Sequence, residues 1–205
     1  VRGIVYALDA MTGDRLWAVR VADVAAHHRS VDVPIVMTLA DGQTSWALVV
    51  SERQGQAGLT ARDARTGKAI WHQPLEAGVA GRPLILHRRI YVPLADPLGT
   101  VVEIQLATGA RIGQFQIRQK IAAELAGGAG PIAGTSRLYV PADARHVFVL
   151  EVGSEAADGT ALPPRLVRDL ATDHPRDSLT GTTLLIGQTP ENEPRYLLLT
   201  VANGP

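Results

Sequence analysis

Short apolar runs separated by polar segments recur along the whole chain. Runs such as 3–8, 46–50 and 195–201 are apolar almost throughout, whereas 101–106 interleaves apolar and polar residues. Runs of this length, rich in Val, Ile, Leu and Tyr and bounded by Gly, Pro or Asp, are typical of β-strands. The pattern therefore predicts an all-β chain of short strands joined by tight turns, and the 20 Gly and 13 Pro residues fit that prediction.

One segment of this pattern, 7–17, is repeated at 61–71 as Ala-x-Asp-Ala-x-Thr-Gly-x-x-aliphatic-Trp. In a hairpin turn the Asp carboxylate can accept hydrogen bonds from following backbone amides, and Gly can take a positive φ without steric cost. The Trp is bulky and its N–H needs an acceptor, so we expect it to dock on a neighbouring copy. The motif residues are Ala7, Asp9, Thr12, Gly13 and Trp17, and Ala61, Asp63, Thr66, Gly67 and Trp71.

Weaker copies extend the repeat. Thr108 and Gly109 form a third Thr-Gly pair, but Gln105 stands at the Asp position and Gly113 at the Trp position. The segment 137–141 echoes 90–93, with the two Tyr residues 48 positions apart. A period of this length is typical of a repeat architecture.

The repeated segment resembles the tryptophan-docking motif of the quinoprotein (pyrroloquinoline-quinone-type) β-propellers. This resemblance implies a propeller of four-stranded antiparallel blades, in which each Trp lies on the adjacent blade. The Thr-Gly turn would join the two outer strands of a blade. The same repeat occurs in dehydrogenases, in outer-membrane assembly lipoproteins and in sensor domains.

Counting strands places a single propeller over residues 1–205. Complete blades are expected at 33–75, 81–117 and 131–170, with partial blades at 1–21 and 180–201. The two partial blades could combine to close a four-bladed ring, or the segment could belong to a propeller of seven or eight blades. Because the chain starts with Val1, two residues before a strand, we favour the larger propeller.

Composition narrows the function classes. The chain has 20 acidic and 20 basic residues, which gives no net charge to attract nucleic acid or an anionic membrane. It contains no Cys, so disulfides, thiolate catalysis and Cys-ligated zinc are excluded. No apolar run approaches the roughly 18 residues of a transmembrane helix.

Four other segments carry candidate chemistry, and each has a plainer interpretation. The pairs His27–His28 and Asp173–His174 could serve a metal or acid–base catalysis, but neither has a third partner at useful spacing, and solvated loops are favoured. The glycines at 127–130 lack the Lys-Ser/Thr of a phosphate loop and are interpreted as an inter-blade connection after a short helix-like patch. The polar segment 51–56 is interpreted as a solvated loop.

These observations favour a non-enzymatic scaffold, sensor or assembly domain that binds a protein partner and needs no cofactor. No catalytic or metal-binding residue can be assigned. The alternative that the resemblance implies is a quinone- and calcium-dependent alcohol or sugar dehydrogenase, with the quinone in the central channel; the vicinal disulfide of some members is absent here. The resemblance also implies export or the cell envelope, and a region before Val1 could tether the chain. If these residues are structural, replacing Trp17 or Trp71 by Ala should lower the free energy of unfolding by about 3–5 kcal/mol in each case.

Overall fold

The computed structural model describes residues 3–22, 34–39, 42–129, 135–143, 145–153, 163–171, 177–179, 185–188, 194–198 and 201–203. Every regular element within these ranges is a β-strand. The chain divides into two compact units, residues 1–79 with 107–110, and residues 80–106 with 111–205.

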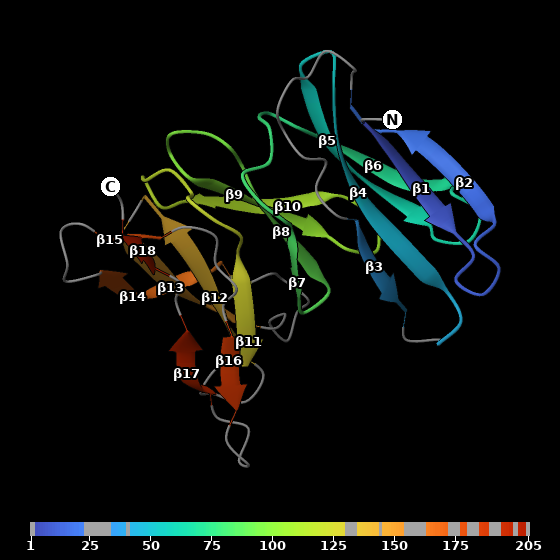
Figure 1. Ribbon diagram of the computed structural model, residues 1–205. Helices are drawn as coiled ribbons and strands as arrows, with labels where there is room; N and C mark the ends of the chain where they lie inside the picture. The colour runs from blue at the N-terminus through green and yellow to red at the C-terminus, as the bar shows by residue number, and fades with distance from the viewer. Residues whose placement is uncertain are drawn as a thin grey trace. The chain divides into compact units, whose positions relative to one another are not determined.

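The first unit contains a hairpin and a four-stranded sheet, both antiparallel (Figure 1). The hairpin joins β1 (Ile4–Leu8) to β2 (Arg15–Arg20). The sheet has the order β3-β4-β5-β6, and its strands are β3 (Ile35–Thr38), β4 (Ser45–Arg53), β5 (Gln56–Asp63) and β6 (Ala69–Leu75). Neighbours in sequence are thus neighbours in space, as expected for a blade.

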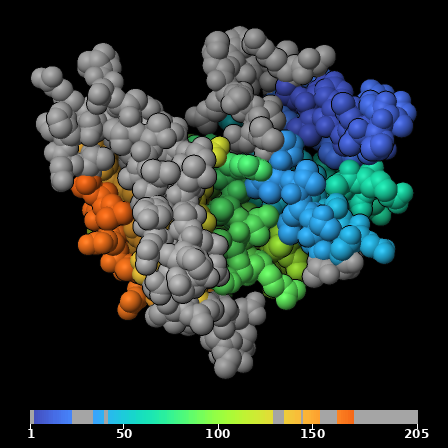
Figure 2. Space-filling view, turned by 60° about the horizontal axis from the view of Figure 1, so that its bottom comes forward, coloured from blue at the N-terminus to red at the C-terminus, as the bar shows by residue number. Residues whose placement is uncertain are grey.

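The hairpin packs against one face of that sheet. Val5 and Val21 of the hairpin segment form a buried cluster with Ala47 and Val49 of β4, and Trp17 lies against the cluster. In the space-filling view the hairpin, in dark blue, stands beside residues of β3 and β4 in lighter blue (Figure 2). Its other face is exposed at Tyr6, Leu8 and Leu16. The hairpin is therefore held to the sheet by one apolar face.

The second unit contains two four-stranded antiparallel sheets and two two-stranded antiparallel sheets. The first sheet has the order β10-β9-β8-β7, with β7 (Leu84–Leu86), β8 (Arg89–Pro93), β9 (Thr100–Gln105) and β10 (Arg111–Gln116). The second has the order β11-β12-β13-β14, with β11 (Ala126–Ala129), β12 (Thr135–Ala142), β13 (His146–Gly153) and β14 (Arg165–Ala171). β15 (Asp177–Leu179) pairs with β18 (Val201–Asn203), and β16 (Leu185–Gln188) pairs with β17 (Pro194–Leu198).

A single apolar cluster joins the two four-stranded sheets of this unit. Tyr91 and Val101 contribute from the first sheet, and Leu138, Val140 and Leu150 from the second. Burying a side chain of this size contributes on the order of 1.5–3 kcal/mol. The central strands β8 and β9 are almost wholly buried, whereas β10 at the edge alternates half-buried and exposed residues. The central strands are therefore covered on both faces, although they include polar residues such as Arg89 and Glu103, whereas the edge strand remains partly exposed.

Two segments differ from their sequence interpretation. Residues 126–129 form strand β11 rather than an inter-blade connection, and the described residues before it form no helix. A Cβ added to Gly127 would lie 2.8 Å from Leu86 Cδ1, so the glycine allows this strand to approach β7 closely.

The polar segment 51–56 is also not a long loop, because β4 and β5 continue through it and pair as far as Arg53 and Gln56. Only Gln54 and Gly55 form the turn, and both have positive φ, as a two-residue hairpin turn requires. Backbone pairing holds the strands there, so polar side chains do not end them.

Candidate functional site

The two complete motif copies form the same turn. Asp9 accepts hydrogen bonds from the backbone N–H groups of Met11, at 2.8 Å, and Thr12, at 3.0 Å. Asp63 accepts from the backbone N–H and the hydroxyl of Thr66, both at 2.7 Å. These donors lower the pKa of both carboxyl groups, chiefly the Thr12 amide for Asp9 and the Thr66 hydroxyl for Asp63. The Asp residues therefore shape the turns.

Each Trp of the motif lies on the turn of the next copy. Trp17 Nε1 donates to the carbonyl oxygen of Ala64 at 2.8 Å, and its ring covers Gly67 so closely that an added Cβ would lie 2.6 Å from Trp17 Cγ. The Trp71 ring covers Gly109 in the same way, with Cδ2 at 2.5 Å from an added Cβ. Gly67 and Gly109 also have positive φ values of 72°. Glycine is thus required at both positions by backbone conformation and by the ring above it.

The third copy carries other residues at the two cross-strand positions of the motif. Ala7 faces Trp17 across the first hairpin, and Ala61 faces Trp71 across the second. At the matching positions of the third hairpin, Glu103 faces Gly113. In the first two hairpins the small residue is on the first strand and the large residue on the second, and in the third hairpin this order is reversed. The Glu103 carboxylate lies over Gly113, with Oε1 3.4 Å from the position of an added Cβ.

That exchange creates a buried polar cluster. Arg89 Nη1 lies 3.6 Å from Glu103 Oε2, and both side chains are at most 5% exposed. Burial raises the pKa of Glu103, and Arg89 opposes the shift. Burial also raises the pKa of Tyr91 to about 12, with the Glu103 carboxylate adding to the shift. Tyr91 also belongs to the apolar cluster between the two sheets, so the ion pair lies beside that contact.

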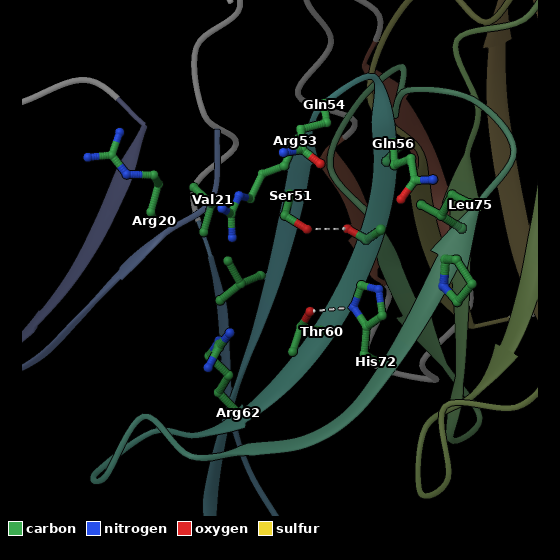
Figure 3. Close-up of a pocket in the computed structure, with 14 residues that line it drawn as sticks. Arg20, Val21, Ser51, Arg53, Gln54, Gln56, Thr60, Arg62, His72 and Leu75 are labelled. Atoms are coloured by element: carbon green, nitrogen blue, oxygen red, sulfur yellow. Dashed lines mark hydrogen bonds between the residues drawn. The ribbon is translucent and has the colours of Figure 1, made fainter. Parts of the chain in front are cut away.

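A pocket of about 550 Å³ opens on the face of the β3–β6 sheet (Figure 3). Its basic lining residues are Arg20 of β2, Arg53 of β4 and Arg62 of β5, and none of the described lining residues is acidic. A backbone hydrogen bond from Glu52 N–H to Val21 O, at 2.8 Å, fixes the end of β2 beside β4. The tight Gln54–Gly55 turn places Arg53 directly opposite Gln56. The pocket is therefore built on paired strands.

His72 forms part of the pocket wall. Its Nδ1 atom is 2.9 Å from Thr60 Oγ1, and its ring lies over Gly58, where an added Cβ would stand 2.5 Å from His72 Cε1. Ser51 Oγ donates to the Gly58 carbonyl oxygen at 3.4 Å. No sequence motif points to these residues, because Thr60 and His72 lie on different strands of a hairpin and are brought together only by strand register.

The other residues that the sequence offered as candidates for metal binding or catalysis are not part of a described site. His27, His28, Asp173 and His174 lie outside the described residues. Within the described part of the chain, no three His, Cys, Asp or Glu residues gather in a way that could hold a metal ion. A search of those residues also finds no helix of the length and hydrophobicity needed to cross a membrane.

Solved structures share this fold. The structure of BBS1N in complex with ARL6DN matches with a TM-score of 0.62 at 16% identity, over 98% of this chain and 56% of that one. Quinohemoprotein alcohol dehydrogenase ADHIIG from Pseudomonas putida HK5 matches with a TM-score of 0.53 at 17% identity, over 82% and 32%. BamB from Moraxella catarrhalis is similar at 15% identity and a TM-score of 0.44, over 94% and 63%.

The first two of these matches confirm the predicted fold class, an all-β chain whose sheets are β-propeller blades. The chain spans about half the length of the BBS1N chain and about a third of the dehydrogenase, so it corresponds to part of those larger chains. No curated protein sequence matches it significantly. Residues 1–162 match the family described as outer membrane protein assembly factor BamB, so the chain belongs to this family of PQQ-like β-propeller repeats.

Proposed function

We propose that this chain is a non-enzymatic interaction scaffold in the cell envelope, acting in outer membrane protein assembly. The observation that carries the proposal is the family match over residues 1–162, because that family is described by this role. A scaffold needs a rigid frame that presents surfaces to a partner, and packed antiparallel blades supply such a frame.

The geometry of the motif supports this proposal. The repeated Asp, Gly and Trp residues form the turns and the contacts of each Trp ring with the turn of the next copy. Their repetition is therefore explained by the architecture, without a cofactor. BBS1N, whose structure shares this fold, is in complex with another protein, ARL6DN, and we assign a comparable use of the fold to this chain.

The alternative is a quinone- and calcium-dependent alcohol or sugar dehydrogenase. It draws on the fold similarity to quinohemoprotein alcohol dehydrogenase. The two functions differ in what stabilises the protein. A cofactor at about 100 times its dissociation constant adds about 2.7 kcal/mol to the stability of the protein that binds it.

The scaffold role is tested in cells of the source organism that carry the full-length protein with an affinity tag. After crosslinking, the purified protein should be enriched in outer membrane assembly proteins, and deletion of its gene should lower the amount of β-barrel proteins in the outer membrane. Fractionation should place the tagged protein in the envelope. Unchanged β-barrel levels with no enrichment would reject the role.

A thermal melt with pyrroloquinoline quinone and calcium tests the alternative. An upward shift of the melting temperature, together with oxidation of an alcohol by an artificial electron acceptor, would replace the scaffold by the dehydrogenase. A melt that does not change is the result expected for the scaffold.

A further inference from the structure

The pocket on the β3–β6 sheet gathers positive charge that the rest of the site does not neutralise. Arg53 and Arg62 enter it from opposite ends of the paired strands β4 and β5, and Arg20 lies at the end of β2 (Figure 3). Among the described residues, no carboxylate forms an ion pair with any of the three. Three guanidinium groups around one pocket repel one another, and an anion within it would relieve that repulsion.

Arg62 supplies a second observation. Its Nη1 atom donates to the Gly67 carbonyl oxygen at 2.9 Å, which holds the side chain in place. Its Nε atom is buried and has no hydrogen-bond acceptor in the described structure. A buried N–H without an acceptor raises the cost of burying this charged group, and a carboxylate beside the guanidinium would lower that cost. The arginine is thus positioned before any ligand arrives.

The remaining lining indicates an organic anion. Pro74 gives the pocket exposed apolar surface, and Gln54 and Gln56 add amide groups that can both donate and accept. A volume of about 550 Å³ lies within the range of roughly 300–1,000 Å³ found for organic ligands. A phosphate site usually gathers successive backbone N–H groups, whereas the charged donors here are side chains from three strands.

We infer that this pocket binds an acidic segment of a protein partner, with carboxylates on Arg53 and Arg62. The inference rests on the proposed function and adds the chemistry of the partner. Because Arg53 is exposed, salt should weaken its contribution to peptide binding, whereas the contribution of the half-buried Arg62 is screened less.

The test is fluorescence anisotropy with the full chain and a fluorescein-labelled hexaglutamate peptide, with labelled hexaglutamine as the neutral match. Saturable binding of the acidic peptide alone is expected, with an affinity that falls between about 0.05 M and about 0.3 M salt. Arg53→Gln should weaken binding about fivefold and Arg62→Gln about tenfold. The matched control is Arg65→Gln, an exposed arginine on the β5–β6 turn outside the pocket, which should change it less than twofold.

Three outcomes would overturn the inference. The acidic peptide fails to bind saturably, or Arg65→Gln weakens binding as much as Arg53→Gln, or inorganic phosphate displaces the peptide at an ionic strength where chloride does not. The last result would assign the pocket to phosphate instead. If Arg62→Gln does not fold, Arg62→Lys is measured instead. Arg62→Lys keeps the charge and should weaken peptide binding less than Arg62→Gln.

The two proposals can fail separately. Unchanged β-barrel levels after gene deletion, with peptide binding intact, would reject the scaffold role alone. A scaffold phenotype without peptide binding would reject the pocket.

Discussion

The docking of Trp17 on Gly67 can be measured with two alanine substitutions that differ in one respect. Gly13 and Gly67 occupy the same place in the same turn, with φ values of 77° and 72°. An added Cβ at Gly13 meets nothing within 4 Å, whereas at Gly67 it stands 2.6 Å from Trp17 Cγ. Gly13→Ala therefore measures the backbone cost of the turn, and Gly67→Ala measures the same cost plus the collision with the ring.

The size of the difference follows from the contact. Forcing Ala into a left-handed conformation costs about 1–2 kcal/mol in both variants, so this cost cancels in the comparison. Ordinary van der Waals contact lies at 3.4–4 Å, so the Trp17 ring must move by almost 1 Å to admit the methyl group. Overpacking of this kind costs about 1–3 kcal/mol, and displacing the hydrogen bond to Ala64 O adds up to about 1 kcal/mol.

Urea and thermal melts of both variants provide the assay, with Trp fluorescence as the probe. Gly67→Ala is expected to be less stable than Gly13→Ala by about 2 kcal/mol, which is roughly 4–8 °C in melting temperature for a chain of this size. Adding Trp17→Ala should remove the extra cost of Gly67→Ala, because the two changes act on one contact. Equal melts for the two glycine variants would show that the ring does not press on Gly67.

Three further predictions follow from the same contacts. Trp71→Ala should lower the free energy of unfolding by about 3 kcal/mol in a urea melt, since it removes the ring that covers Gly109, and a loss below about 1 kcal/mol would contradict the docking. Asp63→Ala should destabilise the protein above about pH 3.8, and progressively less as the pH falls further. The pKa of Asp63 is lowered in the folded state, so the stability that its carboxylate contributes is present above the ordinary pKa and is lost as the pH falls through the folded-state pKa. A difference in melting temperature that does not change with pH would refute this. Glu103→Leu should cost about 3 kcal/mol at pH 7 by removing the carboxylate that forms the ion pair with the buried Arg89, whereas the double variant with Arg89→Met should recover most of that loss in a double-mutant cycle.

The turns are the part of the fold that could be predicted in detail. The spacing from Asp63 to Gly67 is a local requirement, since the carboxylate caps amides two and three residues ahead and the glycine takes a φ that other residues resist. The same reasoning predicted that a Trp must find an acceptor on another copy. It did not identify Ala64 O as that acceptor, because a contact 47 residues away leaves no trace in local spacing.

Predictions from neighbouring residues failed where the structure depends on packing between strands that are distant in sequence. The glycines of β11 resemble a connection in sequence, but they allow a strand to lie close to Leu84 and Leu86. In sequence, the third motif copy appears only as an incomplete match. The structure shows that strand register places Glu103 opposite Gly113. Both features depend on which residues face each other across a sheet.

The sequence by itself therefore determined the all-β class, the repeated hairpins and the residues of their turns, because these depend on neighbours along the chain. The tertiary structure alone decided the Glu103–Arg89 replacement and the arginine pocket. Arg53, Arg62 and His72 meet only after antiparallel pairing brings β4, β5 and β6 into register. Charges that are separated in sequence become one site because strand pairing fixes which side chains share a face.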